Sequence, residues 1–320
     1  MSLAHDFAHP TTEEAGRPPP QLAATLRASP HRWDVHIIGW LLLLPAAVLL
    51  IAFTHFPAVA TIIDSFFSTP KGVRAAAFIG LDNYQAMMED PIFWRSLTNN
   101  VVYALSTIPL TIVLAITMAI VVNGKLIGRP LMRMSFFTPT VLPMIAVANI
   151  WLFFYSPGYG LVDQALGLFG IPSHNWLGSE NTALACLIVV AIWKDAGFFM
   201  IFYLAALQQM PPQLAEVGAL EGASRWYFFR RVTFPLLMPT TLFVLINATI
   251  NSFRLVDHIV VMTRGGPDNC TSLLLFYIYE AGFKFWDIAY AATLTVVLLG
   301  LLAILALGQF LFLDRRIHYQ

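Results

Sequence analysis

The sequence predicts an all-α membrane protein with six transmembrane helices. Among its 320 residues, 58% are hydrophobic and 11% are charged, and the mean hydropathy is +0.70. A soluble domain carries about 25% charged residues, so this composition excludes a soluble globular protein. The apolar residues are gathered in six runs, each long enough for the roughly 20 residues that cross the hydrocarbon core of a bilayer.

Three segments are expected along the chain. Residues 1–34 are polar and rich in proline and lack apolar periodicity, which is typical of a flexible tail. Residues 35–313 form the membrane domain, and residues 314–320 form a second, short tail. The predicted spans are residues 35–63, 97–122, 134–155, 182–208, 236–262 and 288–312.

The connections between the spans differ in length and chemistry. Residues 64–96 form a polar segment outside the membrane, and residues 123–133 form a short basic turn. Residues 156–181 predict a loop with one short amphipathic helix. The two cysteines, Cys186 and Cys270, lie in an apolar run and in a loop, so we expect neither a disulfide nor a metal site.

The distribution of Lys and Arg predicts the orientation of the chain. Six spans place both termini on one side of the membrane, and that side carries eleven of these residues against five on the other. An excess of Lys and Arg marks the cytoplasmic side. Both termini and the connection between the fourth and fifth spans, residues 209–235, are therefore expected in the cytoplasm.

This connection has its own composition. Pro211 and Pro212 suit the first turn of a helix, where a missing N–H costs nothing. Small residues then recur at spacings of three and four, and they form a stripe along which a partner surface can approach closely. The stripe consists of Ala215, Gly218, Ala219 and Gly222.

A bend is expected at the end of this short helix. Gly222 weakens the helix, and Ser224 suits the N-cap of a second one. Pro235 is expected to end that second helix. The connection is therefore predicted to be two short helices joined by a bend.

The spacing of these residues resembles the cytoplasmic loop of ABC-importer permeases. That loop has the pattern E-A-A, two residues, D-G-A, eight residues, then I-x-L-P. Glu216 takes the first position, Glu221-Gly222-Ala223 the D-G-A, and residues 232–235 the end. Val217 and Gly218 replace two alanines and Glu221 replaces the aspartate, which keeps small size and acidity.

Four further motifs extend the resemblance over nearly the whole chain after residue 35. They resemble permease subunits of carbohydrate importers of the maltose and glycerol-3-phosphate type, in particular the first permease of a heterodimeric pair. The resemblance implies the type I ABC-importer permease fold, with a coupling helix between the fourth and fifth spans. The motifs are FIGLDNY (78–84), SPGYGLV (156–162), WKDAGFFMIFYLAALQQMPPQLAE (193–216) and VMTRGGP (261–267).

The resemblance also implies a complex in the bacterial cytoplasmic (inner) membrane. Its other members are a second permease subunit, two ATP-binding subunits and an extracytoplasmic substrate-binding protein, with membrane lipid around them and no nucleic acid. The chain has no G-x-x-x-x-G-K-[ST] loop, so ATP and Mg are expected on the partner subunits, and the chain itself is expected to be neither an enzyme nor a cofactor carrier. The residues expected to couple to the ATPase are Glu216, Gly218, Ala219, Glu221, Gly222 and Ala223.

Polar residues inside the spans are candidates for the substrate path, because they are costly in a membrane. In the fifth span, steps of four, three and four place Asn247, Asn251, Arg254 and His258 on one helix face. This face either lines the path or forms hydrogen bonds between helices. Arg254 either attracts an anionic substrate or pairs with an acid of the partner permease.

In the fourth span, Lys194 and Asp195 interrupt an apolar run. They either line the path or are neutralised within the bundle. The resemblance places Lys194, Asp195 and Phe198, and in the fifth span Asn251, Ser252 and Leu255, beside the substrate cavity.

The expected function is that of a permease subunit of an ATP-driven importer, forming half of the path for a sugar, polyol or glycerol-3-phosphate-like substrate. A secondary transporter that needs no ATP is the alternative, although such proteins usually show an internal repeat with broken helices, and none is visible here. An intramembrane enzyme is disfavoured, since no span carries paired metal ligands and the chain has no G-x-S-x-G motif.

Overall fold

The structure, a computed structural model, describes residues 32–314 apart from residues 71, 73 and 125–127. The described chain divides into two units, one ending at Val59 and the other beginning at Ala60. Most of the two expected tails lies outside the described residues. The first predicted span is helical throughout. It consists of α1 (Arg32–Leu50), a π-helical turn and α2 (Phe56–Asp64).

The second span begins earlier than predicted. A short helix, α3 (Asp82–Glu89), is followed by α4 (Pro91–Asn123), so the helix starts at Pro91 rather than at residue 97. Asp90 explains this start, because its carboxylate accepts a hydrogen bond from the backbone N–H of Ile92 at 2.8 Å. Pro91 takes the first helical position, where proline is favoured.

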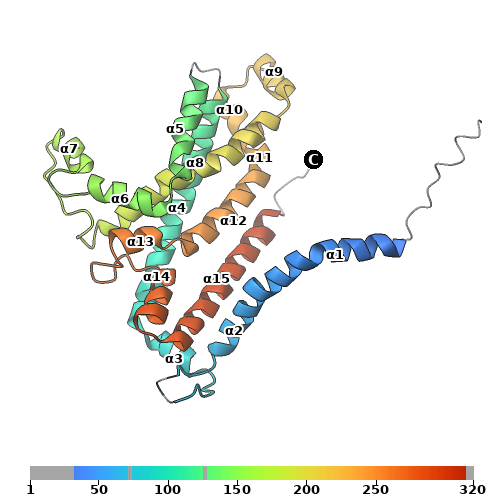
Figure 1. Cartoon of the computed structure of the whole chain (residues 1–320). Helices are drawn as coiled ribbons and strands as arrows, with labels where there is room; N and C mark the ends of the chain where they lie inside the picture. The colour runs from blue at the N-terminus through green and yellow to red at the C-terminus, as the bar shows by residue number, and fades with distance from the viewer. Residues whose placement is uncertain (1–31, 71, 73, 125–127, 315–320) are drawn as a thin grey trace, which may run out of the picture. The chain divides into compact units, whose positions relative to one another are not determined.

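The third span, predicted over residues 134–155, is broken, which the prediction did not anticipate. It consists of α5 (Arg129–Val141) and α6 (Met144–Phe154), whose axes differ by 102°. Leu142 between them has an extended backbone, and Pro143 has no N–H to continue the helical ladder. Figure 1 shows the two helices meeting at this bend.

The following loop and the fourth span agree with the predictions. The loop carries one short helix, α7 (Leu161–Gly167), and the fourth span is α8 (Ala183–Gln209). Helix α8 packs along α4 and α5.

The predicted bend after the fourth span is confirmed, but Pro235 does not end the helix that follows it. The chain passes through a π-helical turn at Phe229–Thr233, whose wider coil accommodates the missing N–H of Pro235. The fifth span then breaks at Leu255 and Val256, which the prediction of one helix over residues 236–262 did not anticipate. The elements are α9 (Pro212–Leu220), α10 (Arg225–Phe228), α11 (Phe234–Leu236), α12 (Met238–Arg254) and α13 (Asp257–Met262).

The last elements are α14 (Leu274–Tyr279), a π-helical turn and α15 (Ile288–Asp314), which is the sixth span. Five described helical segments are long and apolar enough to cross a membrane, and the pair α5–α6 makes a sixth if it is counted as one span. Asp90, at the start of α4, joins that helix to α14 and α15. Its carboxylate also accepts hydrogen bonds from the hydroxyl groups of Tyr277 on α14 and Tyr290 on α15.

Helix α4 lies at the centre of the second unit. Its middle packs with α6, α8 and α13, its second half packs with α8 and α12, and its first half packs with α14 and α15. Figure 1 places α9 and α10 near the end of α4 that leads into α5, and α3 at the other end. The connection with α9 and the broken spans are therefore positioned by one long helix.

Candidate functional site

Helix α9 ends as the sequence predicts. Gly222 has a φ of +70°, and the backbone N–H of Ala223 donates to the carbonyl of Gly218 at 2.9 Å. The N–H of Gly222 donates to Ala219 at 3.2 Å, which completes a Schellman motif. Ser224 then caps α10, since its hydroxyl accepts from the N–H of Tyr227 at 3.2 Å.

The surface of α9 is open over most of its length. Glu216 and Glu221 are exposed, as are Ala219 and Gly222 of the small-residue stripe. Two bulky apolar side chains stand among them, Val217 with 50% and Leu220 with 89% of its surface exposed. Sequence reasoning missed Leu220, although a leucine among acidic and small residues on a polar connection is a visible signal for a docking contact.

Gly218 is the part of the stripe that the chain itself covers. A Cβ atom at this position would lie 2.7 Å from Cδ2 of Phe228, so the aromatic ring of α10 rests directly on the backbone of α9. Any side chain at residue 218 would push the ring away. The stripe therefore serves two purposes: it holds α10 against α9, and it leaves Ala219 and Gly222 open.

The predicted polar face of the fifth span is divided by the break at Leu255. Asn247 and Asn251 are partly exposed and Arg254 is exposed, all on α12. His258 lies beyond the break on α13 and is fully buried, so its prediction as a member of the same face was wrong. The reason is that the steps of three and four hold only within one continuous helix.

Ser252 and His258 are both held by α4. The hydroxyl of Ser252 lies 3.2 Å from that of Thr107, and its carbonyl accepts a hydrogen bond from Asn100 at 3.2 Å. Nε2 of His258 lies 3.1 Å from the hydroxyl of Tyr103. These two polar residues of the fifth span thus make hydrogen bonds between helices.

The three predicted residues of α8 have different surroundings. Lys194 donates hydrogen bonds to the carbonyls of Pro139 and Leu142, at the break between α5 and α6. Asp195 is partly buried. Phe198 is 37% exposed and begins a row of aromatic rings that continues through Phe202 to Phe243 of α12, with neighbouring centroids 5.2 and 5.1 Å apart.

Helix α4 carries a buried polar face that sequence reasoning missed. Its side chains bind residues of α12 and α13, the loop before α14 and the start of α14. Asn99 donates to the carbonyls of Asn269 and Ser272, and Asn100 also accepts from the backbone N–H of Leu274 at 3.1 Å. The spacing of three and four residues was a signal for this face, which comprises Ser96, Asn99, Asn100, Tyr103 and Thr107.

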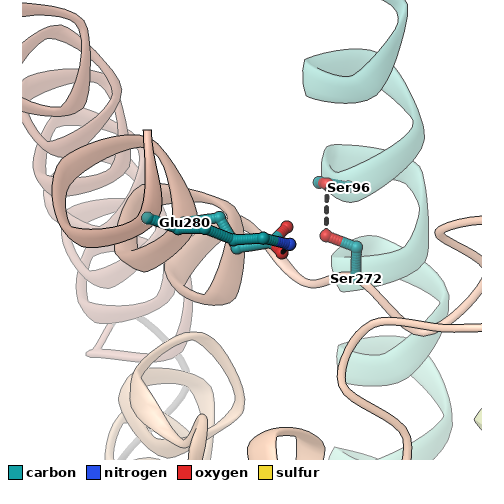
Figure 2. Close-up of polar contacts among 4 residues, drawn as sticks. Ser96, Ser272 and Glu280 are labelled. Carbon is teal, nitrogen blue, oxygen red and sulfur yellow. Dashed lines mark hydrogen bonds and ion pairs between the residues drawn. The ribbon is translucent and has the colours of Figure 1, made fainter. Parts of the chain in front are cut away.

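Figure 2 shows one end of this face. The hydroxyl groups of Ser96 and Ser272 lie 3.0 Å apart, and Glu280 extends from its helix toward the side where this pair lies. Glu280 forms an ion pair with Lys284 at 2.8 Å. With Asn149 and Arg264, the ion pair lines a hollow of about 770 Å³ between α6, α13 and α14.

Asp163 organises the loop between α6 and α8. Its carboxylate accepts hydrogen bonds from the backbone N–H of Gly158 at 2.7 Å, from the hydroxyl of Ser173 and from Nε1 of Trp176 at 2.6 Å. The bond from Gly158 contributes most to lowering the pKa of this carboxyl to about 2, and the bonds from Ser173, Trp176 and the N–H of His174 add to it. A permanently charged carboxylate therefore holds this loop.

Among the residues that the structure describes, no group of three or more His, Cys, Asp or Glu side chains is placed to hold a metal ion. The described part of the chain thus offers an exposed helix, α9, and a partly exposed face of amide, guanidinium and aromatic groups on α8 and α12. The polar face lies on two membrane spans, and α9 lies in the connection between them.

Comparison with known proteins agrees with this arrangement. Residues 111–319 match the family described as "Binding-protein-dependent transport system inner membrane component". The chain is 34% identical over 266 residues to the sulfoquinovosyl glycerol transport system permease protein SmoG of Agrobacterium fabrum, covering 83% of this chain and 86% of that protein. It is 33% identical over 297 residues to the lactose transport system permease protein LacF of Rhizobium radiobacter, covering 90% of this chain and 98% of that protein.

A solved structure shares the fold. It is the crystal structure of a bacterial ABC transporter involved in the import of the acidic polysaccharide alginate, with a TM-score of 0.76 and 23% sequence identity over 89% of this chain and 98% of that chain. This likeness confirms the predicted type I permease fold, in which α9 lies between the fourth and fifth spans. The chain belongs to the family of inner membrane components of binding-protein-dependent transport systems, which are the permease subunits of ABC importers.

Proposed function

We propose that this permease subunit forms half of a translocation path and that a second permease subunit forms the other half. The observation that carries the proposal is the partly exposed face of α8 and α12. Polar groups within membrane spans face a protein interior or a water-filled path, because lipid cannot solvate them. The residues assigned to this path are Asp195, Phe198, Asn247, Asn251, Arg254 and Leu255. Lys194 and Ser252, which were predicted with them, border the path, and their polar groups are held by α5 and α4.

The substrate class that fits this face is a sugar, a polyol or a glycerol-3-phosphate-like compound. Amide groups such as Asn247 and Asn251 offer both donors and acceptors to hydroxyl groups. The exposed aromatic ring of Phe198 offers an apolar face to a sugar ring. The two relatives named above carry a glycosyl glycerol and a disaccharide in their names. Arg254 favours an anionic member of this class, because the guanidinium group binds phosphate and sulfonate oxygens well.

Energy is proposed to enter the complex at α9. Of the two ATP-binding subunits, one would dock on α9 of this chain and the other on the second permease subunit. They would carry the ATP and Mg, so that this chain needs no cofactor of its own. The support for this docking is the exposed surface of Glu216, Leu220 and Glu221 next to the open part of the small-residue stripe. Such a surface, with one apolar anchor among acidic groups, is typical of a contact with another protein.

The proposal extends to the remaining parts of the complex. The excess of Lys and Arg on the side of α9 supports a cytoplasmic location for both termini and for the coupling helix. The opposite side would then receive the substrate-binding protein, and the loop held by Asp163 lies in a connection assigned to that side.

The proposed docking is tested by two substitutions on α9. Glu216→Lys reverses one exposed charge, and Leu220→Ala removes the most exposed apolar side chain. Each is expected to reduce the amount of ATP-binding subunit that copurifies with the permease, about tenfold for a contact worth about 1.4 kcal/mol. The membrane level of the permease is expected to stay unchanged, because both side chains are exposed.

Matched controls are the same substitutions in the loop between α6 and α8. Glu180→Lys and Leu168→Ala also change an exposed carboxylate and an exposed leucine, and they are expected to leave copurification unchanged. Undiminished copurification in both α9 variants would refute the docking role. Uptake by vesicles that contain the permease subunits without the ATP-binding subunits would favour the alternative of a secondary transporter.

A further inference from the structure

The break in the third span leaves two backbone carbonyl groups without helical partners. In a continuous helix the carbonyl of Pro139 accepts from the N–H of residue 143, but residue 143 is a proline and has no N–H. Leu142 has an extended backbone (φ −72°, ψ 136°), so its carbonyl leaves the helical ladder. Backbone groups of this kind must be satisfied inside a membrane, because lipid offers no hydrogen bonds.

Lys194 of α8 supplies the missing donors to both carbonyls. Its ammonium nitrogen lies 3.2 Å from the carbonyl oxygen of Pro139 and 2.5 Å from that of Leu142. The ammonium group also brings a positive charge to the carboxyl end of α5, where the helix dipole is negative. The lysine thus acts as a tethered cation at the end of a half-helix.

The contact depends on a close approach of α8 to α5. A Cβ atom at residue 197 would lie 2.1 Å from the carbonyl oxygen of Phe136, so only glycine allows this approach. Gly197 is one turn from Lys194 on the same helix face. The two residues together set the position of α5 against α8: Gly197 permits the backbone contact, and Lys194 fixes the bend beside it.

We propose that Lys194 is a positioning residue, which replaces the backbone donor lost at Pro143 and so fixes the bent third span, rather than a ligand of the transported substrate. Two of its three N–H donors are already used by the backbone. A substrate ligand would instead hold its donors free for hydroxyl or anionic groups. The two roles can be distinguished by experiment. If the lysine is needed because Pro143 has no N–H, replacing Pro143 should remove that need.

The test compares Lys194→Met, Pro143→Ala and the double variant in the purified complex in lipid nanodiscs. Methionine keeps the length and flexibility of the side chain but has no donor. Alanine at residue 143 restores a backbone N–H, the donor from which the carbonyl of Pro139 accepts when the helix is continuous. Lys194→Met is expected to speed hydrogen exchange of the amides around the bend, in peptides covering residues 136–148, and the double variant is expected to return the exchange toward the wild-type rate.

Rescue by the second substitution separates positioning from substrate contact. Wild-type exchange in Lys194→Met, or a double variant that exchanges as fast as Lys194→Met, would overturn the proposal. If Lys194→Met does not assemble, the amount of complex recovered from membranes becomes the measurement. Recovery of complex in the double variant would support the proposal, and no recovery would overturn it. Lys194→Gln, which keeps two donors without the charge, is expected to exchange at a rate between those of the wild type and Lys194→Met.

Discussion

Asp163 shows how one carboxylate can order a long connection between two spans. It collects donors from both ends of the loop, from Gly158 on one side and from Ser173 and Trp176 on the other. Because each donor stabilises the charged form, the pKa of the folded carboxyl lies at about 2, below its ordinary value of 3.8. The unfolded loop therefore binds a proton at a higher pH than the folded loop.

The sign of the pH dependence follows from this difference. The contribution of Asp163 to loop stability is fully present above the unfolded pKa of 3.8. It is lost as the pH falls from 3.8 through the folded pKa of about 2. The fluorescence of Trp176, isolated as the difference between wild type and Trp176→Phe, is expected to stay constant from neutral pH to about 4 and to change below it. Asp163→Asn is expected to show the altered signal already at neutral pH.

A matched control is Asp268→Asn in the loop before α14, whose carboxylate does not bond to Trp176. It is expected to leave the Trp176 signal unchanged. A Trp176 signal in Asp163→Asn that equals the wild-type signal at neutral pH would show that the carboxylate charge does not hold the loop.

At the scale of elements, α4 connects parts of the chain that are far apart in sequence. Asn100 binds the carbonyl of Ser252 and the N–H of Leu274, so one side chain satisfies a backbone group in the fifth span and one at the start of α14. Asn99 binds two further carbonyls in the loop before α14. Removing such a side chain leaves buried backbone groups without partners, which costs more than the lost hydrogen bonds themselves.

Asn100→Leu is therefore expected to lower the free energy of unfolding by about 2 kcal/mol or more, since two buried backbone groups lose their partner. The measurement is the unfolding of the purified permease in mixed detergent micelles. Asn123→Leu, at the exposed end of the same helix, is the matched control and is expected to change stability by less than about 0.5 kcal/mol. Equal stabilities of the two variants would contradict a structural role for the buried face of α4.

Helix α8 and the two broken spans show how much of this fold the sequence alone can predict. Apolar length predicted α8 to within one residue at each end, because a membrane span is defined by local composition. The break in the third span was not predicted, since a proline in a membrane helix bends it or leaves it continuous according to the donors that neighbours provide. The break in the fifth span was not predicted either, since no proline marks it at Leu255 and Val256. The donor for the third span, Lys194, comes from another helix, and the partners of Asn100 lie 152 and 174 residues away.

For the candidate site, local patterns were sufficient only where the chemistry is local. The bend at Gly222 and the cap at Ser224 depend on neighbouring residues, and both were predicted. The grouping of His258 with Asn247 and Arg254 failed, because it assumed one continuous helix. Its contact with Tyr103 depends on how α13 packs against α4, which the spacing of residues in one span does not contain.

At the scale of the whole molecule, orientation decides which surface meets which partner. The charge distribution predicts that α9 faces the cytoplasm and that the loop held by Asp163 faces the other side. Two exposed positions report on these two surfaces: Gln213 on α9, and Leu168 after α7, which is 86% exposed. Replacing the two native cysteines, Cys186 and Cys270, by alanine gives a background without cysteine.

In that background, Leu168→Cys is expected to react with a membrane-impermeant maleimide added to intact spheroplasts, whose outer membrane and cell wall have been opened. Gln213→Cys is expected to react only after the inner membrane is opened, because α9 then becomes accessible from the cytoplasmic side. The background protein without cysteine is expected to remain unlabelled in both conditions. The reverse pattern would place α9 outside the cell, where no ATP-binding subunit could reach it, and would overturn the proposed coupling together with the orientation.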